Sequence, residues 1–270
     1  MFAWLLLITA VLAAPAATPA QVAVGISARI GPPPLPIYAQ PMCPGPGFIW
    51  VPGYWAYGPM GYYWVPGTWV MAPRVDYLWT PGYWGWGNGF YIWHPGYWGP
   101  HVGFYGGINY GFGYGGGGYA GGRWRNGVFM YNRAVTNVNT TIIHNTYIDR
   151  TVVNNVNVNR VSYNGGEGGT TARPSPGQEA AAREAHMHPT AAQARHERMA
   201  STRRGQFASQ NQGRPDFGAT SRPGTWNRGP ARPNYNRQEN RRGANQQQRR
   251  NNENPPRDNR GERRQPDQFR

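Results

Sequence analysis

Apolar and polar positions divide the chain into blocks of different character. Residues 48–98 are dominated by Trp, Tyr, Phe, Val and Thr, which favour pleated strands over helices. Residues 127–163 alternate apolar residues with Asn and Thr, a pattern typical of half-buried strands. By contrast, residues 201–270 are mainly Arg, Asn, Gln, Gly and Pro. The pattern predicts a mainly β protein: a small Trp-rich antiparallel β-meander repeat domain with a Gly/Asn-rich β extension, flanked by disordered segments.

One hexapeptide, with Trp at both ends and Pro-Gly at its centre, occurs four times within 48–98. The copies begin 14 or 15 residues apart, which suits one extended strand and one turn for each copy. Gly, Pro, Asn and Asp cluster between the copies, where the turns are expected. We therefore expect an up-and-down meander. The aromatic residues of the repeat are Trp50, Trp55, Trp64, Trp69, Trp79, Trp84, Trp93 and Trp98, with Phe48, Tyr62, Tyr77 and Tyr91 two places ahead of each copy.

The Pro-Gly pair inside each copy has two interpretations. Side chains alternate between the faces of a strand, so Trp residues five places apart would point to opposite faces. A bulge of one residue at Pro-Gly would return both rings to the same face. Alternatively, Pro-Gly forms the tip of a tight hairpin, with its two flanking Trp residues paired across it. Pro-Gly favours a type II turn, whose twist suits hairpins poorly, so we favour the bulged strand.

The pattern Tyr-x-Trp-x-Pro-Gly-x-Trp, as in residues 62–69, resembles the YXWGXW (WXXGXW) repeat family of secreted bacterial proteins. All four copies match its Trp-x-x-Gly-x-Trp core. Phe48 replaces the leading Tyr of the first copy, and Thr68 replaces the inner Tyr of the second. The proline-rich lead, the Gly/Tyr stretch and the Asn/Val stretch are also similar to that family. The family has no assigned activity, so the resemblance transfers no catalytic residue.

An apolar run near the N-terminus predicts export. Residues 1–20 have the features of a secretory signal peptide, because the apolar core is short and is followed by Ala-rich cleavage sites. No Arg or Lys precedes the core, so either the amino terminus alone supplies the positive charge or the true start lies upstream. An uncleaved N-terminal anchor is the alternative. We expect the protein in the periplasm, on the outer surface or secreted.

Composition defines the segments on either side of the repeats. Residues 21–47 are rich in Pro and are expected to form an extended spacer. Residues 99–126 mix Gly with Tyr and form either a flexible loop region or a glycine-kinked extension of the sheet. The Asn/Val-rich β segment, 127–163, follows, and residues 164–174 form a linker.

Two short helices are predicted within 175–200. Ser175 and Gln178 have the spacing of a capping box, with Pro at the first helical position. Thr190 and Gln193 form a second capping box after Pro189. Neither helix has a wide apolar face, so we expect them to dock weakly or to form transiently.

Charge is strongly positive and unevenly distributed. The formal net charge is +15, and all 27 basic residues are Arg. Residues 172–270 contain 20 of them against nine acidic residues. Within this region, 201–270 cannot bury enough apolar surface to fold and is predicted to be disordered.

The basic tail points to an anionic partner. Arg pairs with phosphate groups, and for an exported chain the nearest polyanions are cell-envelope polysaccharide and anionic lipid headgroups. The signal peptide argues against nucleic acid. A tail that only solvates the protein is the alternative.

The sequence contains no signature of an enzyme or a metal site. G-x-S-x-G, H-E-x-x-H and P-loop motifs are missing. His186, His188 and His196 match no standard spacing of metal ligands. Cys43 is the only cysteine, either a free thiol in a loop or one half of an intermolecular disulfide. We expect a non-enzymatic protein with no cofactor and no metal.

The rings of the repeat have two interpretations. They form the core, because large aromatic side chains dominate packing in small sheets, and this is the interpretation we favour. Alternatively, the eight Trp residues of the copies, with Tyr62, Tyr77 and Tyr91, form a platform for the flat faces of sugars.

The role that fits the sequence best is structural or adhesive, in the cell envelope, with the basic tail contacting anionic envelope material. The first alternative is a carbohydrate-binding module that uses exposed Trp and Tyr. The second is a self-associating secreted fibre subunit built from 127–163, since Asn-rich, β-branched segments with little charge pair edge to edge in ordered fibres.

Overall fold

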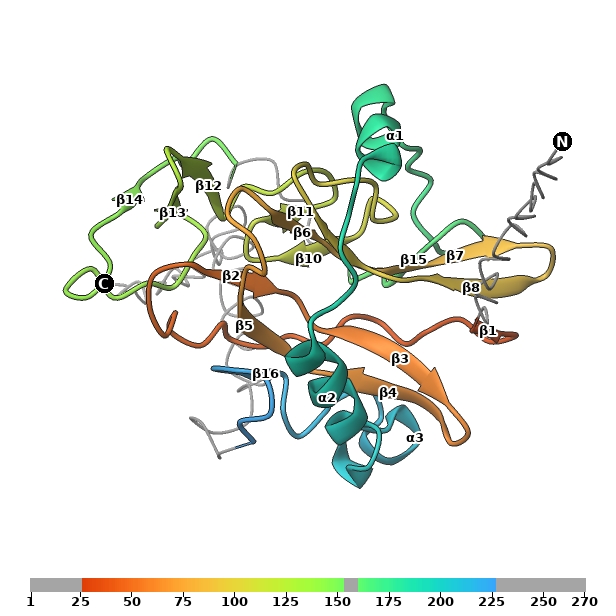
Figure 1. Ribbon diagram of the computed structural model, residues 1–270. Coiled ribbons are helices and arrows are strands. Elements are labelled where there is room, and N and C mark those ends of the chain that lie inside the picture. The colour runs from red at the N-terminus through yellow and green to blue at the C-terminus, as the bar shows by residue number, and fades with distance from the viewer. Residues whose placement is uncertain (1–25, 153–159, 227–270) are drawn as a thin grey trace, which may run out of the picture.

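The computed structural model describes residues 26–152 and 160–226 (Figure 1). Its regular structure is mostly short strands in antiparallel hairpins, so the predicted mainly β class is confirmed. Two bent hairpins built from residues 48–99 form the centre, and the other segments pack around them. The predicted signal peptide, residues 1–20, and the end of the tail lie outside the described residues.

The first hairpin contains the first two copies of the hexapeptide. Its strands are β2 (Phe48–Val51), β3 (Tyr54–Gly58), β4 (Gly61–Val65) and β5 (Gly67–Met71). Strand β3 pairs with β4 next to the tip, which is formed by Pro59 and Met60, and β2 pairs with β5 further along the ribbon. Each arm of the hairpin is therefore one long strand that is interrupted once.

The second hairpin has the same design. Its strands are β6 (Leu78–Thr80), β7 (Tyr83–Gly87), β8 (Phe90–His94) and β9 (Tyr97–Gly99). Strand β7 pairs with β8 next to a tip at Asn88 and Gly89, and β6 pairs with β9. Within the described residues no ladder joins β5 to β6. The two arms of each hairpin thus pair with each other, as neighbouring strands do in a meander. The two hairpins contact each other through side chains.

Pro-Gly lies in the middle of each hairpin arm and not at a hairpin tip. The interpretation that places Pro-Gly within a strand is therefore confirmed, and the tight hairpin at Pro-Gly is wrong. The expected bulge of one residue is not present, because Val51 pairs with Thr68 before the interruption and Tyr54 pairs with Val65 after it, so both arms contribute two residues. Each Trp pairs across the ribbon with a Trp of the neighbouring copy, and the ring centroids are 5.2–5.3 Å apart. The pairs are Trp50 with Trp69, Trp55 with Trp64, Trp79 with Trp98 and Trp84 with Trp93.

The glycine of each copy makes room for a Trp ring from the paired copy. A Cβ atom on Gly67 would lie 2.5 Å from Cζ2 of Trp50 and 3.0 Å from the backbone nitrogen of Gly53. The other three glycines are blocked in the same way: Gly53 by Trp64, Gly82 by Trp93 and Gly96 by Trp79. None of the four has a positive φ, so the repeat needs glycine for space and not for an unusual backbone conformation.

The proline-rich lead crosses the hairpins as a strap, which corrects the predicted spacer. Strand β1 (Ser27–Ala28) pairs with β8, and the rest of 26–43 is irregular. Pro34 O accepts a hydrogen bond from Trp55 Nε1 at 3.3 Å, and Pro41 O accepts one from Trp69 Nε1 at 2.8 Å. Extended proline-rich backbone makes no internal hydrogen bonds, so its carbonyl groups are free to pair with indole N–H groups.

Cys43, at the end of the strap, is buried with 5% of its surface exposed. Its Sγ donates to Gly45 O at 3.2 Å, and burial raises the pKa of the thiol. The side chain therefore packs as a small apolar residue, in a position that does not suit an intermolecular disulfide.

The Gly/Tyr region is a glycine-kinked extension of the β structure. It contains β10 (Asn109–Gly111), β11 (Tyr114–Gly115) and β12 (Gly122–Arg125), and β12 pairs with β13 (Val128–Asn132). Gly111, Gly113 and Gly116 have positive φ angles, which glycine adopts without steric cost. Tyr114 is fully buried, and its hydroxyl donates to Trp79 O at 2.9 Å. The region thus covers the second hairpin.

Residues 135–143 form turns and irregular backbone, so the strand predicted there is wrong. Asn132 Oδ1 accepts from the backbone N–H groups of Ala134 and Asp149, and Asn139 Oδ1 accepts from that of Thr141. Asn side chains can replace ladder partners in this way and favour turns. In the described residues between 144 and 164, the strands are β14 (Thr146–Tyr147) and β15 (Tyr163–Asn164). Residues 153–159, in the later part of the Asn/Val-rich segment, lie outside the described part.

Both predicted capping boxes are present. Helix α1 (Pro176–Arg183) begins after Ser175, and α2 (Ala191–Ala200) begins after Thr190. Helix α2 docks on both hairpins and buries Gln193, which corrects the expected weak docking. Among the described residues, no helix is long and apolar enough to span a bilayer.

The start of the tail, residues 201–226, has regular structure, which differs from the disorder predicted for these residues. It contains η1 (Arg204–Gln206), α3 (Ala208–Asn211) and β16 (Ala219–Thr220), and β16 pairs in parallel with β5. Gln206 Nε2 donates to Trp64 O and Phe217 O, both at 3.0 Å, and Phe207 packs on Tyr63. A few aromatic and amide side chains thus anchor a segment of low overall hydrophobicity.

We expect Gly96→Ala to lower the free energy of unfolding by about 2 kcal/mol, because core overpacking typically costs this much. The added Cβ would lie 2.5 Å from Trp79 Cζ2 and 2.6 Å from Thr80 O. Gly87→Ala in the same hairpin is the control, since a Cβ there meets nothing within 4 Å. Chemical denaturation of both variants measures the difference, and equal stabilities would show that the glycines do not fix the Trp rings.

Candidate functional site

The structure places the predicted binding residues in the core, with one exception. Trp50, Trp55, Trp64, Trp69, Trp84 and Trp98 are at most 1% exposed, and Trp79 is 5% exposed. Tyr62, Tyr77 and Tyr91 are also buried. Trp93 alone among the eight repeat Trp residues is only half-buried. These positions favour the core interpretation over a continuous platform of exposed rings.

Indole N–H groups connect the core to the segments around it. Trp84 Nε1 donates to Trp55 O at 2.7 Å and so links the two hairpins. Trp64 Nε1 donates to Gly218 O in the C-terminal segment at 2.9 Å. Because an indole can only donate, each buried ring needs an acceptor nearby. Trp50 is an exception, since its Nε1 has no hydrogen-bond partner among the described residues.

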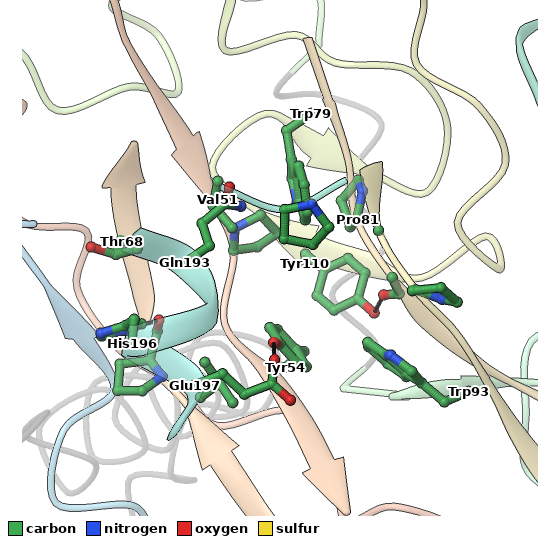
Figure 2. Close-up of a pocket in the computed structure, with 17 residues that line it drawn as sticks. Val51, Tyr54, Thr68, Trp79, Pro81, Trp93, Tyr110, Gln193, His196 and Glu197 are labelled. Carbon is green, nitrogen blue, oxygen red and sulfur yellow. Dashed lines mark hydrogen bonds between the residues drawn. The ribbon is translucent and has the colours of Figure 1, made fainter. Parts of the chain in front are cut away.

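A cavity of about 80 Å³ lies where the Pro-Gly interruptions of both hairpins converge. Its walls include the prolines of all four copies, Pro52, Pro66, Pro81 and Pro95. Figure 2 shows Gln193, His196 and Glu197 on one side, with Trp79, Tyr110 and Trp93 across from them. Helix α2, which carries the first three, closes that side of the cavity.

Helix α2 docks on both hairpins through polar side chains. Gln193 Oε1 accepts from Trp98 Nε1 of the second hairpin at 2.9 Å. On the first hairpin, His196 Nε2 lies 3.0 Å from Pro66 O, and Glu197 Oε2 accepts from the Tyr54 hydroxyl at 3.0 Å. Positions 193, 196 and 197 share one helix face. This docking surface is polar, so the lack of a wide apolar face in α2 did not predict it. The spacing of Gln193, His196 and Glu197 along the helix would have indicated it.

Glu197 is the only carboxyl group among the described residues that line the cavity. Burial raises the pKa of this carboxyl, although hydrogen bonds from Tyr54 and Tyr63 and the nearby charge of Arg198 oppose the shift. Burial, together with Glu197, raises the pKa of Tyr63 to about 12. The two phenols therefore stay protonated and hold the acid in place. A single acid of this kind offers a hydrogen-bonding group but not a pair of catalytic carboxyls.

His196 connects the repeat to the C-terminal segment. Its Nδ1 accepts from the Gly224 N–H at 3.1 Å, so Nε2 carries the proton and donates to Pro66 O. Burial lowers the pKa of His196 to about 4, although the bond to Pro66 opposes the shift. Trp226 stacks on the imidazole at 5.2 Å, and the Arg203 guanidinium lies over Trp226 at 4.3 Å. The neutral ring is thus a link between two parts of the chain.

Two of the three histidines considered as metal ligands, His186 and His196, have other contacts. Both ring nitrogens of His196 are hydrogen-bonded, and His186 packs against Tyr97. In the part of the chain that the structure describes, no group of three or more His, Cys, Asp or Glu side chains could hold a metal ion.

A second feature of the surface is a group of exposed arginines near β12. Arg123 and Arg125 lie on β12, Arg133 follows β13, and Arg150 follows β14. None of the four forms an ion pair with another described residue. Arg123 lies over the ring of Tyr147, 4.6 Å from its centroid. The exposed surface near β12 therefore carries positive charge.

Comparison with known proteins identifies the repeat. A family model described as WXXGXW repeat matches twice, over residues 45–70 and 74–98, which bears out the resemblance seen in the sequence. The two matches coincide with the two bent hairpins, so one family repeat contains two hexapeptides and folds as one structural unit. No curated protein and no solved structure matches the chain.

The pKa of His196 predicts a pH dependence of stability. Between pH 6.5 and about 4 the unfolded chain binds a proton that the folded protein does not, so stability falls as the pH decreases through this range. The loss amounts to roughly 3 kcal/mol, since each unit of pKa shift corresponds to about 1.4 kcal/mol. It is fully regained above pH 6.5.

Chemical denaturation across this pH range, with His196→Gln as the comparison, measures the effect. The glutamine amide can still donate and accept but does not titrate. Wild type should lose stability relative to this variant as the pH falls. Parallel pH profiles of the two proteins would contradict the assigned tautomer and burial.

Proposed function

We propose that this WXXGXW repeat protein is an exported, non-enzymatic envelope protein with a structural or adhesive role, and that its basic C-terminal segment contacts anionic envelope material. The observation that carries the proposal is that aromatic side chains make up the core and arginines are on the surface. The aromatic rings of the repeat are buried, whereas the arginines of the described part are mostly exposed. What the scaffold offers to a partner is therefore mainly positive charge.

The positive charge continues in the residues that follow the described part of the chain. Residues 227–270 contain 12 arginines and five acidic residues. Arginine binds phosphate and carboxylate groups in two-pronged geometry and remains charged at all relevant pH values. A segment of this composition suits a polyanion such as phosphorylated envelope polysaccharide or a layer of anionic lipid headgroups.

Trp226, the last described residue before the Arg-rich segment, is held on the scaffold by ring contacts. Trp226 packs between His196 and the Arg203 guanidinium, and its ring also contacts Phe217. His196 in turn bonds to Pro66 of the repeat. These contacts support a model in which the repeats form a rigid scaffold and the arginines after Trp226 bind the anionic envelope material.

Export rests on the apolar run within residues 1–20. The same run argues against a nucleic-acid partner in the cytoplasm. The fibre alternative receives less support, because residues 133–142 of the Asn-rich segment form turns and irregular backbone, and backbone N–H groups there bond to Asn side chains.

The test replaces all 12 arginines between 228 and 270 by Gln, with replacement by Lys as the control that keeps the charge. Binding of each full-length variant to phosphorylated envelope polysaccharide and to vesicles of anionic phospholipid is measured by co-sedimentation. Wild-type binding should weaken at least about tenfold when salt rises from about 50 to 200 mM, as expected for contacts that release counterions. The Lys variant should behave similarly, and the Gln variant should bind at least about tenfold more weakly than wild type at low salt.

Comparison of the two probes distinguishes polysaccharide from lipid as the partner. Undiminished binding by the Gln variant to either probe would contradict attachment through the tail.

A further inference from the structure

The cavity between the hairpins and α2 has features of a ligand site that the proposed tail contacts do not use. All four Pro-Gly interruptions border it, so both family repeats are needed to build it. Its volume of about 80 Å³ has room for about five water-sized groups, since one water needs roughly 15 Å³. This is the size of a substituent and not of a whole sugar ring.

A buried amide group in the cavity wall has unused hydrogen-bonding capacity. Gln193 is 9% exposed, and its Oε1 accepts from Trp98 Nε1 and from the Thr190 N–H. The Thr190 hydroxyl also donates to this oxygen, whereas Nε2 has no acceptor among the described residues. An amide nitrogen is a donor of two hydrogen bonds, so this side of the cavity suits a ligand group that accepts.

A hydrogen-bond acceptor, the carboxyl group of Glu197, lies one helical turn from the Gln193 donor. Glu197 is four residues after Gln193 on the same face of α2, about 6 Å away at the Cβ atoms. Its carboxyl accepts from Tyr54 and Tyr63. An ionised carboxyl group has more than two acceptor positions, so Glu197 can accept a further N–H or O–H group.

The remaining walls are apolar and include one ring that is not fully buried. Val51, Pro52, Pro81 and Trp79 provide aliphatic and aromatic surface. Trp93 lines the cavity, is only half-buried, and stacks on Tyr54 with centroids 5.1 Å apart. A ring in this position can contact the flat C–H face of a group that lies outside the cavity.

We propose that this cavity binds the acetamido group of an N-acetylated amino sugar. The methyl group meets the apolar wall, the carbonyl oxygen accepts from Gln193 Nε2, and the amide N–H donates to Glu197. The sugar ring stays outside against Trp93. With four non-hydrogen atoms, the acetamido group fits the available volume.

Other substituents of the same sugar fit less well. An ammonium group would pair with Glu197 but would place its N–H donors near the donor of Gln193, which would stay without an acceptor. A hydroxyl group would leave most of the apolar wall empty and lose those contacts. The observations therefore favour the acetamido group.

Three trisaccharides that differ only at C2 provide the test: the trimers of N-acetylglucosamine, of glucosamine and of glucose, all β-1,4-linked. Their binding to the full-length protein is measured by calorimetry at low and high salt. The acetamido sugar should bind at least about tenfold more tightly than the other two, since one well-placed hydrogen bond together with apolar contact accounts for such a factor. Binding of this uncharged ligand should persist in high salt.

Gln193→Glu tests the location. A glutamate keeps the acceptor for Thr190 N–H and Trp98 Nε1 but removes the unpaired donor. Gln178→Glu is a matched control, because Gln178 occupies the same position in the capping box of α1, outside the cavity lining. The first variant should bind the acetamido sugar at least about tenfold more weakly, and the second should bind as wild type does.

A measurement on the wild-type protein does not depend on how the variants fold. The indole N–H resonance of Trp93 should shift on titration with the acetamido sugar, whereas that of the exposed Trp86 should not. The protein with all tail arginines replaced by Gln should bind equally well, which separates this site from the proposed function.

Several outcomes would overturn the proposal: no binding of the acetamido sugar, equal or tighter binding of either other trisaccharide, or unchanged binding by Gln193→Glu. Loss of binding in the variant without tail arginines would also do so.

Discussion

The close approach of two glycines within each hairpin is the constraint on which the rest of the structure depends. At Gly53 and Gly67, and again at Gly82 and Gly96, the paired arms lie too close for any side chain. The space above each glycine is filled by a Trp ring from the opposite copy. Proline before each glycine removes a ladder donor where the arm is interrupted. Two hexapeptides therefore interlock into one unit, which explains why the family repeat spans about 25 residues and not six.

The many buried indole N–H groups need hydrogen-bond acceptors. Segments far apart in the sequence provide these acceptors. The strap supplies Pro34 O and Pro41 O, the C-terminal segment supplies Gly218 O, and α2 supplies Gln193 Oε1. The chain around the repeats is thus part of the folded unit. A fragment consisting of residues 44–171 would lack the strap, α2 and β16, and would leave several of these buried donors unpaired, at a cost of about 1–3 kcal/mol each.

Local chemistry was enough to predict the strands of the repeat, the placement of Pro-Gly within a strand and both capping boxes, but not that the strand would be interrupted without a bulge. Propensity and cap geometry depend on neighbouring residues, which the sequence displays directly. The pairing of copies into two separate hairpins was not predictable, because it depends on contacts such as that of Trp50 with Gly67. The docking face of α2 and the folded segment 201–226 were also missed. Both are stabilised by polar side chains whose partners in the hairpins lie more than 90 residues away: Gln193, His196, Glu197 and Gln206.

Hydrogen exchange of the indole N–H groups, followed by NMR, tests most directly whether the repeat Trp residues form a core. The account predicts slow exchange for Trp64, Trp69, Trp84 and Trp98, which are buried and bonded to acceptors. Trp86, which is 41% exposed, should exchange rapidly and provides the internal reference once Trp86→Phe has assigned its signal. Exchange of the four buried indoles as fast as that of Trp86 would contradict the account.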